Sequence, residues 1–155
     1  KTPKVEFNIN STVSIQNVFH MPDFFRELMR QGLIDHPHCF HINLVHHPFW
    51  LNVGILHPNK KQLIDKLYTD WEEELKTTYK PAWRTETLVR HIRGFKKFMW
   101  SSEYNPKMIE RFILEMERID AVRGQTWQEE IPEMADLDPD WQIKRIKKQD
   151  PFIYE

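Results

Sequence analysis

Apolar and polar residues alternate at the start of the chain, and this alternation predicts a β-strand over residues 4–15. Val5, Phe7 and Ile9 fall on one face, and Val13 and Ile15 continue in phase with them. Many residues of the segment are β-branched, as strands favour. We therefore expect a strand with one apolar face.

A second alternating segment covers residues 39–47 and predicts a second strand. Phe40, Ile42 and Leu44 share one face, and the polar residues His41 and Asn43 fall on the other. A proline then interrupts the segment, and residues 50–56 predict a short third extended piece.

Between the two strands, residues 21–32 predict a helix. Pro22 suits its first turn and Gly32 ends it. An apolar stripe along it consists of Phe24, Phe25, Leu28 and Met29. Helical periodicity also predicts three long helices and one short one, over residues 57–79, 85–100, 106–124 and 126–134. Thr126 and Glu129 match a capping box at the start of the short helix.

Strand, helix and strand in this order form a βαβ unit, whose strands pair in parallel. Parallel strands are normally covered on both faces, and two strands cannot make such a sheet alone. We expect an α/β fold with a βαβ portion over residues 1–57, a helical extension over 58–131 and a polar C-terminal tail over 132–155. A partner chain or further sequence would complete the sheet.

The composition of the chain argues against several classes of protein. The net charge is −1, which gives no overall attraction to nucleic acid or anionic lipid. No apolar run reaches the length of a membrane span, so no membrane partner is expected. A single cysteine, Cys39, excludes an internal disulfide framework and an iron–sulfur site made by this chain alone. These features predict a cytoplasmic protein.

Several short motifs occur in a characteristic order. The first predicted strand ends in Thr12-Val13-Ser14, followed by Asn17, and the second strand and the residues after it contain Asn43, Val45, Pro48 and Leu51. A long predicted helix then begins at Leu56-His57-Pro58, with Lys60 and Lys61 in its first turns. Near the end of the chain, Asp120 and Arg123 precede Pro132-Glu133. In this order the chain resembles, over roughly residues 4–137, the later part of radical S-adenosylmethionine (radical SAM) proteins of the twitch-domain kind, many of them from phages and environmental bacteria.

The resemblance implies the C-terminal portion of such an enzyme, with the last strands of a partial parallel (β/α) barrel and a helical extension. It implies S-adenosylmethionine and a 4Fe–4S cluster as cofactors, radical generation by reductive cleavage, and hydrogen abstraction from an unknown substrate. The family's three cluster cysteines, spaced Cys-x3-Cys-x2-Cys, are absent here. Their place is expected in the remainder of the same enzyme or in a partner chain, and this chain alone is expected to be inactive.

Polar residues near the carboxyl ends of the two strands are the candidates for a binding site, because ligands bind at these ends in parallel barrels. The candidates are Asn10, Thr12, Asn17, Asn43, His46 and His47. The resemblance implies that they contact the cofactor's ribose or the substrate. The alternative is that Asn17 and Asn43 only satisfy backbone groups at turns. No catalytic residue is identified.

The histidines between residues 36 and 57 raise the alternative of a small histidine-rich metal-binding protein. Zinc or copper needs three or four converging ligands. His41 and His47 would lie ~20 Å apart on a straight strand, at about 3.3 Å per residue, so they cannot chelate one ion together. We therefore expect no metal site.

Two other interpretations are weaker. Cys39 has no flanking motif of a catalytic thiol, and aromatic residues mixed with Lys and Arg follow helix-core spacing, so neither thiol catalysis nor nucleic-acid binding is expected. The basic run 144–148 is either a solvated tail or a docking tail. The main alternative function is a non-catalytic interaction module that docks through the unpaired strand edge and this tail.

Overall fold

The computed structural model of the protein describes residues 7–138. The predicted tail beyond residue 138, including the basic run 144–148, lies outside the described residues. The described chain forms two compact units that divide between Pro106 and Lys107. The boundary expected at residues 57 and 58 falls inside the first unit.

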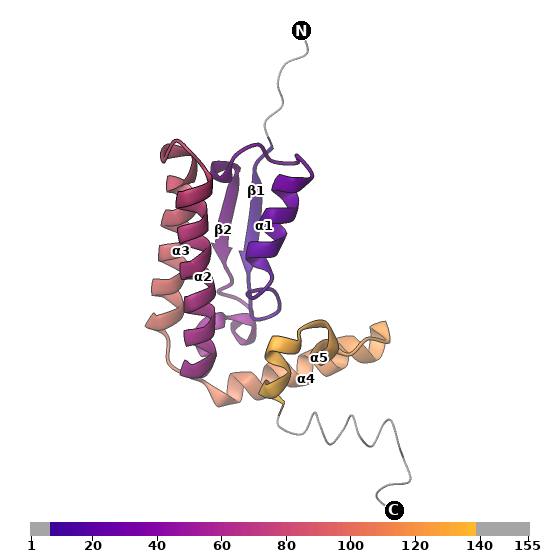
Figure 1. The fold of residues 1–155 in the computed structure, drawn as a ribbon. Coiled ribbons are helices and arrows are strands. Elements are labelled where there is room, and N and C mark those ends of the chain that lie inside the picture. The colour runs from indigo at the N-terminus through magenta and orange to yellow at the C-terminus, as the bar shows by residue number, and fades with distance from the viewer. Residues whose placement is uncertain (1–6, 139–155) are drawn as a thin grey trace, which may run out of the picture. The chain divides into compact units, whose positions relative to one another are not determined.

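Two parallel strands form the sheet of the first unit. β1 (Ile9–Val13) pairs with β2 (Phe40–Leu44), Ile9 lying opposite Phe40 and Val13 opposite Leu44. Helix α1 (Met21–Arg30) connects them (Figure 1). The predicted α/β combination and the parallel pairing are confirmed. The described residues contain no third strand, and a partial barrel remains a proposal.

Helix α1 begins and ends where the sequence predicts. Pro22 lies in the first turn, where its missing N–H leaves no hydrogen bond unmade. Gly32 has φ +67°, a left-handed conformation that glycine adopts without steric cost. Phe25 and Leu28 of the predicted stripe are buried, whereas the Phe24 side chain is 45% exposed.

The predicted extended piece at residues 50–56 is wrong. The chain forms two 3₁₀ turns there, Phe49–Leu51 and Val53–Ile55. The Asn52 side-chain oxygen accepts a hydrogen bond from the Gly54 amide at 2.7 Å. This local bond favours a turn over an extended strand.

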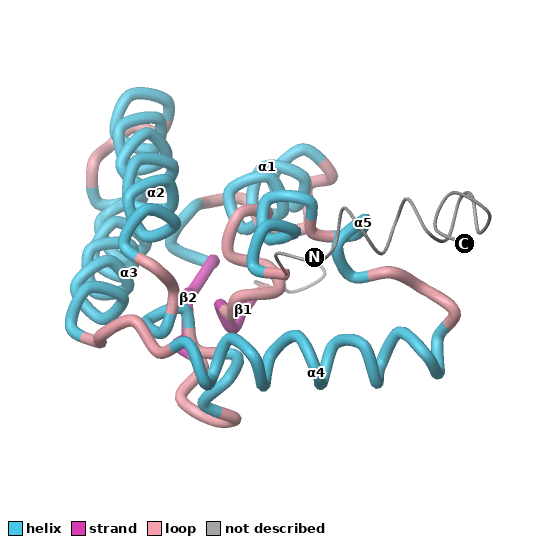
Figure 2. Tube along the Cα trace, turned by 90° about the horizontal axis from the view of Figure 1, so that it is seen from below, coloured by secondary structure: helices cyan, strands magenta, loops and turns pink. Residues whose placement is uncertain are grey.

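Helices α2 (Pro58–Thr78) and α3 (Trp83–Ser101) complete the first unit. They lie side by side next to β2 in both views (Figures 1 and 2). One side of α2 is buried through Ile64, Tyr68, Trp71 and Leu75. Both helices therefore belong to the same unit as the strands.

The second unit contains α4 (Pro106–Arg123), α5 (Trp127–Glu130) and a 3₁₀ helix over Pro132–Leu137. The rings of Phe112 and Trp127 pack edge to face, 5.3 Å apart. The predicted capping box is wrong, because the Thr126 side chain makes no capping bond. The Asp120 carboxylate, one turn before the end of α4, accepts from the Trp127 amide instead, at 2.6 Å.

No helix in the described part of the chain combines the length and apolar character that crossing a membrane requires.

Candidate functional site at the strand ends

The two faces of the β1–β2 pair have opposite character. Phe40 points into the layer of helices, where its ring lies 5.5 Å from that of Phe25 on α1 and 6.3 Å from that of Trp71 on α2. Val13 and Ile42 share this face and are buried. Edge-to-face ring contacts of this kind fix the sheet on α1 and α2.

The opposite face of the pair is polar. Asn10, Thr12 and Asn43 are exposed on it, and His41 is half-buried. The register places Asn10 beside His41 and Thr12 beside Asn43, and paired residues point to the same side of a sheet. This face, which we call the polar face, therefore offers amide, hydroxyl and imidazole groups but no charged side chain from either strand.

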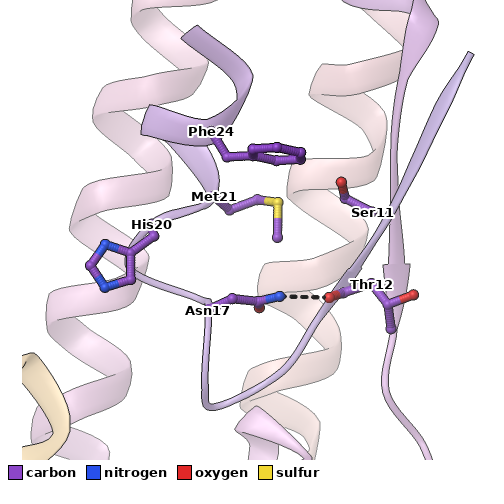
Figure 3. A pocket seen from close by; sticks show the side chains of 6 residues that line it. All are labelled: Ser11, Thr12, Asn17, His20, Met21 and Phe24. Carbon is purple, nitrogen blue, oxygen red and sulfur yellow. Dashed lines mark hydrogen bonds between the residues drawn. The ribbon is translucent and has the colours of Figure 1, made fainter. Parts of the chain in front are cut away.

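Asn17 shapes the loop that follows β1. Its side-chain oxygen accepts from the Ser14 amide at 2.9 Å, and its side-chain nitrogen donates to the Thr12 carbonyl at 3.0 Å (Figure 3). Both ends of the Asn17 amide are thus engaged with backbone. Asn17 positions this loop, as the alternative interpretation from the sequence proposes.

Tyr68 holds the same loop against α2. Its hydroxyl donates to the Val18 carbonyl at 3.1 Å, and the ring is fully buried. Burial raises the pKa of this phenol well above its ordinary value. The loop is therefore anchored at Asn17 on the strand side and at Tyr68 on the helix side.

A hollow of about 370 Å³ opens between β1, this loop and α1. Its lining residues are Ser11, Thr12, Asn17, His20, Met21 and Phe24. The Phe24 ring, the Met21 thioether and the Ser11 hydroxyl gather on one side, whereas the Thr12 side chain points away from them (Figure 3). Apolar walls and a polar strand edge give the hollow a mixed character.

The outer edge of β2 is covered by α3. The Ile42 amide donates to Nδ1 of His91 at 3.3 Å. Since Nδ1 accepts this bond, the proton of the neutral ring lies on Nε2. Burial lowers the pKa of His91, and the nearby His41 and Arg90 lower it further. Because Nδ1 can accept a hydrogen bond only when the ring is neutral, this bond also favours the neutral form of His91.

The outer edge of β1 differs. The Val45 amide donates to the Val13 carbonyl at 3.2 Å, so the backbone groups of Val13 face β2. Because backbone groups alternate along a strand, those of Asn10 and Thr12 face away from β2. No strand of the described residues pairs with them, and the Thr12 carbonyl accepts from the Asn17 side chain.

The structure brings the six predicted site residues together only in part. Thr12 and Asn17 both line the hollow, while Asn10, Thr12 and Asn43 share the polar face. His46 and His47 follow β2 and are exposed. The His46 ring lies 5.1 Å from that of Phe98 on α3.

Sequence reasoning missed three residues of this region. The sequence pattern places His91 in a predicted helix, and a lone helical histidine carries no signal that it will reach a strand 49 positions earlier. The pattern places Met21 in a helix and Phe24 in the apolar stripe of that helix. The proximity of residues 21 and 24 to a predicted strand end offered the only usable signal.

His36, His38 and Cys39 precede β2 and lie apart from the carboxyl ends of the strands. The rings of His36 and His38 stack at 5.3 Å, next to Trp83. Within residues 7–138, no three His, Cys, Asp or Glu side chains are grouped to hold an ion. Cys39 carries a thiol and is 1% exposed. One buried thiol does not fit a 4Fe–4S cluster, which needs several thiolates.

Comparison with known proteins gives no assignment: no family model matches the chain, and neither a curated protein nor a solved structure matches it.

Proposed function

We propose that the chain is the C-terminal part of a radical SAM enzyme and lines the cofactor and substrate side of its site. The cluster ligands would lie outside this chain, in the remainder of the enzyme or in a partner chain. The observation that carries the proposal is the polar face, which lies opposite the helix-covered face of a parallel strand pair.

This arrangement is typical of a barrel wall. Parallel strands are normally covered on both sides, and in a barrel one face meets the helices while the other lines the interior. Here Phe40 and Ile42 face the helices and Asn10 and Asn43 face away. A partial barrel completed by further strands would enclose these polar side chains.

The motifs behind the family resemblance occupy positions that suit this role. Thr12-Val13-Ser14 ends β1, and Asn17 closes the turn that follows. His57 precedes α2, and its ring nitrogen accepts from the Asn59 amide at 3.3 Å. Each motif thus marks the end of a strand or the start of a helix, where binding groups and their supports are expected.

The chain's own residues fit S-adenosylmethionine better than they fit the cluster. Asn10, Thr12 and Asn43 offer side-chain donors and acceptors suited to the hydroxyl and amino groups of the cofactor. His46 and His47 lie beyond the end of β2, on the same side as the Asn17 loop beyond β1. Asn17 would act by positioning the loop.

The first test is the complete gene that contains this chain. The proposal expects a Cys-x3-Cys-x2-Cys motif in it, or in a neighbouring gene whose product binds the chain, and iron and sulfide in the purified protein. A complete gene product without that motif, and without a partner that carries it, would refute the proposal.

The second test is a titration of the ¹⁵N-labelled protein with S-adenosylmethionine. Amide shifts are expected at Asn10, Thr12 and Asn43, and Asn59 on α2 is the matched control. Asn10→Ala and Asn43→Ala should each weaken binding, whereas Asn59→Ala should not. If the amide signals of these three strand residues do not shift at millimolar S-adenosylmethionine, the polar face is not the cofactor site.

A further inference from the structure

We propose that the outer edge of β1 binds one additional strand of polypeptide in a fixed register, with an apolar side chain of that strand seated in the hollow. This inference rests on the proposed function, in which the added strand belongs to the polypeptide that completes the barrel. Four observations on residues of the first unit support it.

The first observation is the composition of the edge. Native proteins protect exposed strand edges with lysine, proline, inward-pointing charges or bulges. Residues 7–13 read Phe-Asn-Ile-Asn-Ser-Thr-Val and contain no charge and no proline. Their pairing with β2 is regular, without a bulge. An edge of this composition is typical of a strand that is paired.

The second observation concerns the backbone groups that the edge presents. Asn10 offers both its amide and its carbonyl, and Thr12 offers its amide. The Thr12 carbonyl already accepts from Asn17. Asn17 therefore marks the end of the edge, and an added strand would pair along Asn10 and reach no further than the Thr12 amide.

The third observation is the hollow beside this edge. On the helix-covered face, the β1 side chains run Ile9, Ser11 and Val13, so a small residue stands between two branched ones. The residue of an added strand opposite Ser11 would point to the same side. It would enter the space walled by Met21 and Phe24, which at about 370 Å³ accommodates a leucine or a phenylalanine.

The fourth observation is that the opposite edge is already occupied. Nδ1 of His91 accepts a hydrogen bond from the Ile42 amide, and α3 packs along β2. Of the two edges that the described strands form, the β1 edge is therefore the one at which further strands can join. Since the other strands of a βαβ arrangement are parallel, we expect the added strand to run parallel to β1.

Amide hydrogen exchange measured by NMR tests the proposal. In the 155-residue chain, exchange should alternate along β1: slow at Ser11 and Val13, which face β2, and fast at Asn10 and Thr12. In the complete protein encoded by the gene that contains the chain, Asn10 and Thr12 should slow by at least about a hundredfold. Fast exchange there would overturn the proposal.

Two variants of the complete protein sharpen this test. Asn10→Pro removes the outward amide and leaves the β1–β2 ladder intact, whereas Asn10→Ala keeps that amide. Asn10→Pro should restore fast exchange at Thr12, and Asn10→Ala should not. If Asn10→Pro fails to fold, Ser11→Leu fills the hollow from within the chain and should speed exchange at both amides about tenfold. Unchanged protection in Ser11→Leu would refute the seated side chain.

The outcomes separate this inference from the proposed function. Protection that grows with protein concentration would identify a second copy as the occupant and refute a strand of the completing polypeptide. Protection in a complete protein that lacks the cysteine motif, and that has no partner carrying it, would refute the proposed function and leave strand binding in place. Cofactor binding without protection at Asn10 and Thr12 would refute strand binding alone.

Discussion

Along the outer edge of β2 the amide of Ile42 donates to His91, whereas along the outer edge of β1 the amides of Asn10 and Thr12 face away from every described strand. The first edge is closed by a side chain that lies 49 positions later in the sequence. Within residues 7–138, the second carries one local bond, from Asn17 to the Thr12 carbonyl. The sheet thus has one edge covered by α3 and one edge with which no further described strand pairs.

The difference shows how one chain can fix the direction in which a sheet extends. A helix that covers an edge satisfies its backbone groups and blocks further pairing. An edge that keeps its backbone groups, with no charge beside them, favours the addition of a strand. The polar face borders both edges, so any extension at β1 would enlarge that face.

The largest expected effect comes from removing the support that both edges share. Phe40→Ala deletes the ring that packs against Phe25 and Trp71, and we expect it to lower the free energy of unfolding by about 3–5 kcal/mol. Chemical denaturation monitored by tryptophan fluorescence measures this. The conservative control Phe40→Leu should lose less. Equal losses would show that ring packing is unimportant there.

The closed edge can be tested at His91. His91→Leu leaves the Ile42 amide without an acceptor, and we expect a loss of about 1–3 kcal/mol in the free energy of unfolding. His91→Gln supplies an oxygen acceptor and should recover part of that loss. Fast exchange of the Ile42 amide in His91→Leu but not in His91→Gln would confirm the assignment. Equal exchange in both variants would contradict it.

The local bond on the open side should matter less. Asn17→Ala removes the acceptor for the Ser14 amide and the donor for the Thr12 carbonyl, and we expect a loss of about 1–2 kcal/mol. Asn17→Asp keeps the acceptor and loses the donor, so it separates the two bonds. Thermal unfolding of the three proteins measures the order, wild type above Asn17→Asp above Asn17→Ala. An Asn17→Asp variant no more stable than Asn17→Ala would exclude a contribution from the Ser14 bond.

The closed edge should also weaken in acid. The folded state lowers the pKa of His91, so the unfolded chain binds more protons between the folded value and the ordinary value of 6.5. The stabilising contribution is present in full above the ordinary value and is lost as the pH falls from that value through the lowered pKa of the folded state. Between pH 7.5 and pH 5.5, we expect the melting temperature to drop more in the wild type than in His91→Gln. His41 and Arg90 also face this ring, and His41→Gln removes the neighbouring imidazole as a control.

The smallest effect is expected on the polar face. Asn10→Ala and Asn43→Ala alter exposed side chains and should change the free energy of unfolding by less than about 0.5 kcal/mol. Under the proposed function, their effect should appear in the binding of S-adenosylmethionine instead. A large loss of stability in either variant would show a structural role for the polar face.

The sequence predicted the helices and strands where the pattern repeats over several residues. Phe40, Ile42 and Leu44 alternate strictly, and the helix from Met21 begins next to a proline and is followed by a glycine. It failed where a single side chain decided the local geometry. The Asn52 oxygen turned residues 50–56 into 3₁₀ structure, and Asp120 supplied the bond that Thr126 was expected to provide.

The residues of the candidate site were predictable from the sequence to a similar extent. Thr12 and Asn17 follow from the rule that parallel strands present their binding groups at the carboxyl ends. The exposure of Phe24 did not follow, because periodicity assigns it to an apolar stripe with Phe25. The contact between His91 and Ile42 depends on the packing of a distant helix, and no local pattern encodes that packing.

The Tyr68 phenol, which holds the loop after β1 against α2, can be followed by its ultraviolet absorbance. Among the tyrosines of residues 7–138, Tyr68 is the one whose side chain is fully buried, with its hydroxyl bonded beneath the strand-end loop. Its phenolate should not form on alkaline titration while the first unit remains folded. Its ultraviolet ionisation step should therefore coincide with unfolding of that unit, which gives an intrinsic spectroscopic reporter without any label.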